Sequence, residues 1–372
     1  MIEKRIQSVS ILRICATFMV FFCHTWGITG RVFKADALWG KIIFFMKAPA
    51  WGGVWIFFIL SGYLCGKGFA SDKYSLTPSG ILKFYLYKLI KIGIPTWFFI
   101  FIFCVIAHPD FIVSNPSVLT RFLTFTYDGI PETGGIGVCW FVSTLMQMYF
   151  LSPFFCYFLH TFDTKTNHNK IVRIIVLILF ITIGFLYRIK LYTNGLDWEL
   201  HVYRPFLPNL DLFLVGIQLN KLVHPDKGKY KSNTFRNCIL LFSLAVLWIL
   251  NSYLCFYSNQ KHYLFIYQYI LPSIYAAFVS VFIYFYIEKR DSAVRKGYSV
   301  SRWFDKISFQ FYLWHSLILI NISPYITASS AIEFYFKLLA ITFVITCILA
   351  ALYSQMFYFL IKRPLLCSGN VL

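Results

Sequence analysis

Arg13 and His24 are two polar side chains inside the first long apolar run of the chain, where hydrocarbon normally excludes both. They are eleven residues apart, which is almost three turns of an α-helix, so they project from one face. With a rise of about 1.5 Å per residue, His24 lies roughly 16 Å deeper than Arg13. Histidine exchanges protons near neutral pH, which makes it the usual general base. The pair therefore predicts a functional histidine–arginine site inside a membrane.

Three further polar groups fall in apolar runs, and each also has a purely structural interpretation. Ser61, followed by Gly62, fits a small-residue contact between membrane helices. A histidine such as His315 is often a hydrogen-bonded packing residue. Asp211 is harder to explain this way, because a carboxylate in lipid needs a partner or a watery cavity. Arg13 itself lies near an interface, where an arginine can extend its guanidinium to water.

The composition indicates what surrounds these groups. Hydrophobic residues make up 59% of the 372 residues, aromatic residues 21% and charged residues 13%, far from the averages of globular proteins. We expect an all-α, polytopic integral membrane protein with about ten transmembrane helices, a single domain over residues 1–372 and no soluble domain. The predicted spans are 11–29, 51–70, 92–107, 138–160, 171–192, 206–223, 238–257, 264–287, 308–326 and 338–361.

The formal net charge of +19 has a topological explanation. With the N-terminus in the cytoplasm, 24 of the 34 lysines and arginines fall on the inner side and 10 on the outer side. This asymmetry follows the positive-inside rule and places both termini in the cytoplasm, with an even number of spans. The basic residues form no separate domain, so nucleic acid is not an expected partner.

Metal binding and an extended soluble region are not expected. The ten cysteines form no C-x-x-C pair, and we read them as small apolar packing residues. No cluster has the ligand spacing of a metal site. The longest segment between spans, about 108–137, is rich in proline and glycine and predicts an irregular external loop.

Four segments, in order along the chain, resemble the acyltransferase-3 family of membrane enzymes that O-acylate cell-surface glycans. Arg13 and His24 match the R-x10-H signature of that family. Residues 57–63 resemble its F-F-x-x-S-G-[FY] segment, residues 140–142 its W-F-[LV] segment and residues 308–315 its S-x-x-x-Y-L-x-H segment. Each match is weak alone, and the four together are specific.

The resemblance implies an O-acyltransferase of the bacterial inner membrane that moves an acetyl group from cytoplasmic acetyl-CoA to a saccharide or lipid-linked glycan. Acetyl-CoA would be a co-substrate, with no permanently bound cofactor. His24 would be the general base, and Arg13 would position the donor or the developing charge. Ser61 and Tyr63 would line or pack the donor cavity. Weaker candidates for the substrate pocket are Asp211, His315 and Trp140.

The chain departs from the family pattern at three places, one of which is the closing Glu-Arg-Pro-like tail, where it has lysine, arginine and proline at 362–364. Members usually carry an R-x-x-R pair ahead of the third span, thought to hold the coenzyme, and here Lys88 and Lys91 stand in its place, followed by the expected Pro95. Lysine keeps the charge but loses the bidentate geometry of arginine toward phosphate. Members also often have an acidic residue three positions before Arg13, where this chain has Ser10.

Other functions fit parts of the same pattern. A transporter or flippase for a saccharide also needs polar residues at mid-membrane, although its paired repeats with interrupted helices are not found in this sequence. A succinyltransferase differs only in the donor. A membrane scaffold would leave the shared face of Arg13 and His24 unexplained.

Overall fold

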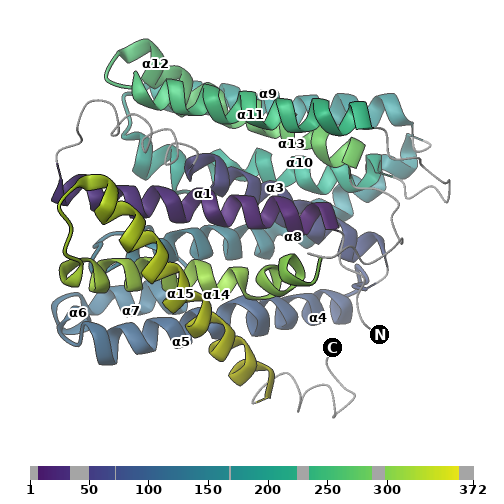
Figure 1. Ribbon diagram of the computed structural model, residues 1–372. Coiled ribbons are helices and arrows are strands. Elements are labelled where there is room, and N and C mark those ends of the chain that lie inside the picture. The colour runs from purple at the N-terminus through teal and green to yellow at the C-terminus, as the bar shows by residue number, and fades with distance from the viewer. Residues whose placement is uncertain are drawn as a thin grey trace.

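The structure is a computed structural model that describes residues 7–33, 50–71, 73–166, 169–223, 234–286 and 298–359. All regular secondary structure within these ranges is helical, with no strand. The prediction of an all-α fold is therefore confirmed. Most of the long helices run side by side in one bundle (Figure 1).

Every predicted span overlaps a helical segment of the described chain, and residues 287, 360 and 361 of the predicted spans lie outside the described residues. Eight of them fall on the single helices α1 (Gln7–Val32), α3 (Ala50–Ala70), α8 (Cys139–Lys165), α9 (Lys170–Thr193), α10 (Leu210–Leu222), α11 (Thr234–Phe256), α14 (Tyr298–Ile322) and α15 (Ala331–Phe357). The span predicted at 264–287 corresponds to α12 (Lys261–Phe265), a π-helical turn (Ile266–Ile270) and α13 (Leu271–Tyr286).

Seven helices in the described ranges are long and apolar enough to cross a membrane, which supports a multi-pass membrane protein. The spans predicted at 206–223, 238–257 and 308–326 are helical but lie outside this set of seven. Helix α10 has only 13 residues, and α14 carries the charged residues Arg302, Asp305 and Lys306 in its first half. The side chains of residues 234–241, the first part of α11, are outside the described part of the chain.

The third span is longer than predicted, because the helix starts at Pro78 and continues to Ala107. It consists of α4 (Pro78–Lys88), a π-turn (Leu89–Gly93), α5 (Ile94–Ile102) and a second π-turn (Phe103–Ala107). In the first π-turn the Ile94 N–H bonds to the Leu89 carbonyl, five residues back. Pro95 follows directly, and a proline has no N–H and crowds the carbonyl four residues earlier. The wider turn accommodates the proline without ending the helix.

The prediction of an irregular loop over 108–137 is partly wrong. The segment contains two short helices, α6 (Asp110–Ser114) and α7 (Pro116–Leu123). Proline at the first position suits a helix start, and Pro116 begins α7 in this way. The helices bury Phe111, Val118 and Phe122 against the end of the bundle, so the apolar residues of the segment order it.

Helix α10 lies at the centre of one half of the bundle and packs against α3, α8, α9 and α13. The contact between α3 and α10 is very close: a Cβ on Gly62 would lie 1.9 Å from the Phe213 carbonyl oxygen, and one on Gly216 would lie 2.1 Å from that of Ile59. Only glycine permits this approach. Gly62 is therefore the small residue that lets the two membrane helices come close.

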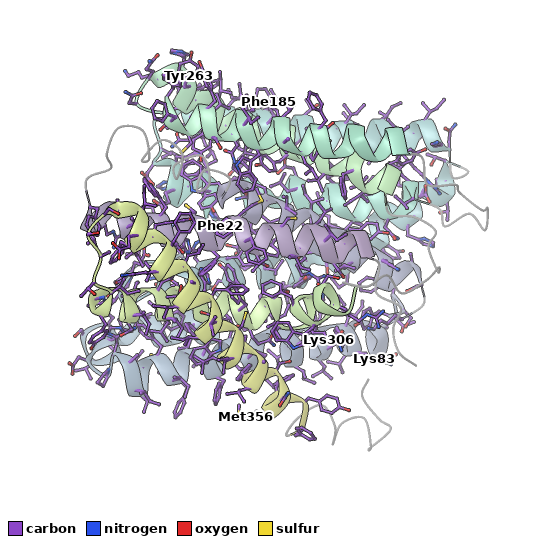
Figure 2. All side chains as sticks on the ribbon, in the orientation of Figure 1. Phe22, Lys83, Phe185, Tyr263, Lys306 and Met356 are labelled. Atoms are coloured by element: carbon purple, nitrogen blue, oxygen red, sulfur yellow. The ribbon has the colours of Figure 1, made fainter. Side chains whose placement is uncertain are left out.

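Helices α1, α14 and α15 pack against one another beside this half of the bundle. Helix α1 packs against α3 on one side and α14 on the other, and α15 crosses them obliquely (Figure 1). Helix α1 begins and α15 ends at the same end of the bundle. Lys83 and Lys306, from two loops predicted to be cytoplasmic, lie toward that end, and Tyr263 lies toward the other (Figure 2). The termini and most of the basic loop before α14 are outside the described residues.

We predict that these two ends correspond to the two sides of the membrane. In a variant without native cysteines, Ser71→Cys should resist an impermeant maleimide in intact cells and react after permeabilisation, because basic residues crowd its side. Thr133→Cys, at the opposite end of the third span, should react in intact cells. Both positions are exposed in the bundle. The reverse labelling would place Arg13 on the outer side and contradict a cytoplasmic donor.

Candidate functional site

The histidine of α1 meets the histidine of α14. Nδ1 of His24 lies 2.8 Å from Nε2 of His315, a hydrogen-bond distance, and the two rings are nearly parallel with centroids 5.0 Å apart. His315 is 1% exposed, whereas His24 keeps part of its surface accessible. The two residues are 291 positions apart, so sequence reasoning named both without predicting that they touch.

His315 is fixed from its other side. Its Nδ1 lies 2.6 Å from the Tyr312 carbonyl oxygen, one helical turn earlier. The rings of Phe21 and Phe311 lie 6.2 Å and 6.3 Å from the His315 ring, between centroids. The imidazole is thus held by hydrogen bonds in the ring plane and by aromatic neighbours, which restricts both its position and its rotation.

Arg13 also has its partner on α14. Its Nη1 lies 2.6 Å from Oδ1 of Asp305, and the Ser10 hydroxyl donates to Oδ2 at 3.1 Å. The Asp305 side chain is 0% exposed and that of Arg13 is 24% exposed, so the guanidinium retains an accessible edge. Asp305 was not predicted. It supplies, from another helix, the carboxylate that the family pattern would place at Ser10.

The two contacts have nearly equal spacing on the two helices. Asp305 precedes His315 by ten residues, and Arg13 precedes His24 by eleven. Helices α1 and α14 therefore run parallel, with an ion pair at one level and a histidine pair roughly 15 Å further along. The matched spacing was a signal in the sequence that could have identified Asp305.

The other motif segments converge beside the histidines. The Phe141 ring lies 5.2 Å from that of Phe58 and 5.1 Å from that of Tyr312, and Phe57 lies 6.3 Å from Tyr312, between centroids. The Tyr312 hydroxyl donates to the Val138 carbonyl at 2.8 Å, which joins α14 to the start of α8. Segments that are separate in the sequence thus form one aromatic layer that ends at Tyr312, one turn from His315.

Trp140 belongs to the neighbouring layer. Its ring packs on Tyr203 at 4.9 Å and on Phe141 at 6.2 Å, between centroids, and it is 9% exposed. It contacts the aromatic layer through Phe141, and its role as a pocket residue stays a prediction.

Lys88 and Lys91 have different neighbours, and a π-turn begins between them. Lys88 is buried, with its ammonium nitrogen 3.6 Å from the centroid of the Tyr149 ring. Lys91 donates to the Tyr87 hydroxyl at 3.3 Å and interacts electrostatically with Arg13 and Lys88. Lys91 is therefore an electrostatic neighbour of both Arg13 and Lys88.

Ser61 and Tyr63 lie at the close contact between α3 and α10. Tyr63 is 3% exposed, and its backbone nitrogen would lie 2.6 Å from a Cβ on Gly216. This position is explained by helix packing, and a role of either residue toward a donor stays a prediction.

Asp211 is buried in an ion pair with Arg188. Both its oxygens accept from Arg188, at 3.0 Å each, and Arg188 also donates to the Pro208 carbonyl at 2.8 Å and the Ser273 hydroxyl at 2.9 Å. A Cβ on Gly184 would collide with the carboxylate, so glycine makes room for the pair. The ion pair accounts for Asp211 without a substrate.

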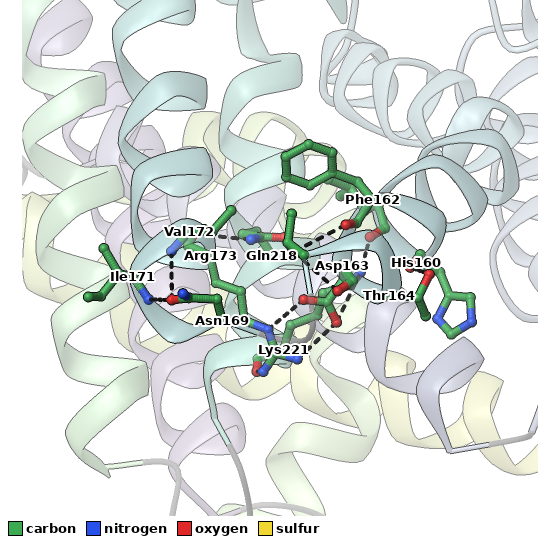
Figure 3. Close-up of polar contacts among 12 residues, drawn as sticks. His160, Phe162, Asp163, Thr164, Asn169, Ile171, Val172, Arg173, Gln218 and Lys221 are labelled. Carbon is green, nitrogen blue, oxygen red and sulfur yellow. Dashed lines mark hydrogen bonds and ion pairs between the residues drawn. The ribbon is translucent and has the colours of Figure 1, made fainter.

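A second ionic cluster joins α8, α9 and α10 (Figure 3). Asp163 accepts from Arg173 at 2.6 Å and 2.9 Å, and Lys221 lies 3.9 Å from the same carboxylate. Gln218 donates to the Arg173 carbonyl at 3.0 Å. Each charged side chain has a neighbour of opposite charge, so this cluster is explained by its structural role in joining three helices. Among the described residues, no group of three histidine, cysteine or acidic side chains is placed to hold a metal ion.

A family model described as an acyltransferase domain matches residues 6–351, nearly the whole chain. No curated protein and no solved structure matches the chain. The matched range includes both histidines, the Arg13–Asp305 pair and the aromatic layer.

The ion pairs Arg188–Asp211 and Arg13–Asp305 should contribute differently to the free energy of unfolding. Asp211→Ala strands Arg188, which is 1% exposed, and should cost about 3–5 kcal/mol of unfolding free energy. Asp305→Ala should cost less, about 1–3 kcal/mol, because Arg13 can reach water. Unfolding by SDS in mixed micelles measures both. A larger loss for Asp305→Ala would contradict this order.

Proposed function

Because the chain belongs to the acyltransferase-3 family, we propose that it transfers an acetyl group from cytoplasmic acetyl-CoA to a hydroxyl of a bacterial cell-surface or lipid-linked saccharide. It is a membrane acyltransferase by its family and its apolar helices. The observation that carries the proposal is the contact of a partly accessible His24 with the buried His315.

The chemistry needs a base at the position of His24. A sugar hydroxyl is a poor nucleophile at neutral pH, so its proton must be removed as its oxygen attacks the thioester carbonyl. His24 accepts that proton, and the tetrahedral intermediate collapses with cleavage of the carbon–sulfur bond. The proton then passes from His24 to the departing thiolate, which leaves as free coenzyme A. Atoms and charge balance, and the base is restored for the next turnover.

The donor end has the charges that a coenzyme would require. Arg13 keeps an accessible edge beside its bond to Asp305, and Lys91 is its electrostatic neighbour. A phosphate is favoured by several cations held together, and the separation of about 16 Å between Arg13 and His24 suits an extended pantetheine arm. Lys73 also lies over the Tyr87 ring, with its ammonium nitrogen 4.4 Å from the ring centroid, and that of Lys91 lies 5.4 Å from the same centroid.

We predict that His24→Ala leaves the protein in the membrane and lowers acyl transfer by about a hundredfold to ten-thousandfold, the usual effect of losing a general base. The assay follows label from radioactive acetyl-CoA into glycan with purified protein, at matched abundance. His160→Ala, an exposed histidine on α8, is the control. Near-native transfer by His24→Ala would refute the assignment of the base. Mass spectrometry of the glycan separates acetyl from succinyl by the increment added.

We predict that the double change of Lys88→Ala and Lys91→Ala mainly raises KM for the acyl donor. Contacts to phosphate are kept from the bound state to the transition state, so their loss weakens binding more than chemistry. Lys83→Ala is the matched control, since this exposed lysine lies on the same helix, α4, as Lys88. A fall in kcat at unchanged KM would contradict a donor-binding role. Arginine at both positions should lower KM, because guanidinium engages phosphate through two hydrogen bonds.

A further inference from the structure

We infer that His315 is a positioning residue that holds His24 in one tautomer, with Nδ1 protonated, and so makes Nε2 of His24 the atom that takes the proton. The inference rests on the proposed function and deepens it. It concerns the acceptor side of the reaction, because it fixes which edge of the His24 ring must face the attacking hydroxyl.

The direction of the hydrogen bond between the two histidines follows from the Tyr312 carbonyl, which lies on the far side of His315. The Tyr312 carbonyl can only accept, so Nδ1 of His315 carries a hydrogen. In a neutral imidazole the second nitrogen is then an acceptor, and Nε2 of His315 is the atom that faces His24. Nδ1 of His24 must therefore donate. This leaves the lone pair of His24 on Nε2, away from His315.

The alternative protonation states do not preserve a base. If His315 were charged, its Nε2–H would point at Nδ1 of His24, which would then have to accept, and the His24 hydrogen would move to Nε2. The aromatic and apolar surroundings of His315 oppose that charge, since Phe21 and Phe311 flank it and its exposure is 1%. A neutral His315 is thus the state that both its surroundings and its carbonyl partner favour.

The same bond serves the charged state of His24. When His24 takes the proton of the hydroxyl, both its ring nitrogens carry hydrogen, and Nδ1–H still points at the acceptor Nε2 of His315. A hydrogen bond from a charged donor is stronger than a neutral one, so the contact favours the protonated base as it forms. This is the role of the third member in a nucleophile–base–orienter arrangement, filled here by a second histidine.

The test compares two substitutions of His315. His315→Leu removes the acceptor and should lower kcat by about tenfold to a thousandfold, with KM for acetyl-CoA within about twofold of the native value. His315→Gln can present an amide oxygen to Nδ1 of His24, so it should retain at least about tenfold more activity than the leucine variant. His160→Leu controls for the loss of a histidine elsewhere.

A spectroscopic measurement tests the tautomer without changing His315. In protein labelled with [15N]histidine, the ring signals that disappear in His24→Ala belong to His24, and we expect them to show hydrogen on Nδ1 and a bare Nε2. Hydrogen on Nε2 would overturn the inference, as would native kcat in His315→Leu. Neither result touches the base assignment if His24→Ala is inactive. Near-native transfer by both His24→Ala and His315→Leu would refute the base assignment together with the inference. The proposed function itself fails only if the native protein moves no acyl group from acyl-CoA to glycan.

Discussion

The ion pair between Arg13 and Asp305 sets the register on which the histidine contact depends. A hydrogen bond of 2.8 Å between side chains of two helices requires those helices to keep their relative height to a fraction of an ångström. Parallel apolar helices slide over one another with little change in packing, but a 2.6 Å ion pair to a fully buried carboxylate does not permit sliding. The charged end of the helix pair thus positions the neutral end, which carries the histidine proposed as the base.

The buried polar side chains of this protein fall into two kinds, which differ in whether part of the side chain stays accessible. Around Arg188 and Arg173, several guanidinium hydrogens have oxygen partners and the side chains are sealed, as a structural ion pair in a low dielectric requires. Arg13 and His24 each have one fixed partner and some accessible surface. Pairing on one side with access on the other is the arrangement that lets a group be oriented by the protein and still meet a ligand.

The sequence predicted the helices well because each span is an apolar run whose length is set by the bilayer, a local property. It predicted the histidines for a similar reason, since a polar group in such a run stands out. The ion-pair partners of these polar groups could not be predicted from the sequence. Asp305 is 292 positions from Arg13 and lies ahead of the predicted span 308–326, and the Arg188–Asp211 pair depends on how two helices pack against each other. The π-turn before Pro95 was also missed, because hydrophobic periodicity predicts a helix without its hydrogen-bond pattern.

The glycine contact between α3 and α10 has a mechanical consequence. Two backbones in van der Waals contact at Gly62 and Gly216 cannot approach further, and separating them would open a void along the most densely packed seam of the bundle. The two helices therefore behave as one rigid body. Helix α1 packs on α3 through Gly53, where a Cβ would lie 2.7 Å from the Ala16 carbonyl, so this body extends to the helix that carries His24. Any rearrangement that admits a substrate must be borne by the helices packed around this block, while the helix that carries His24 keeps its place.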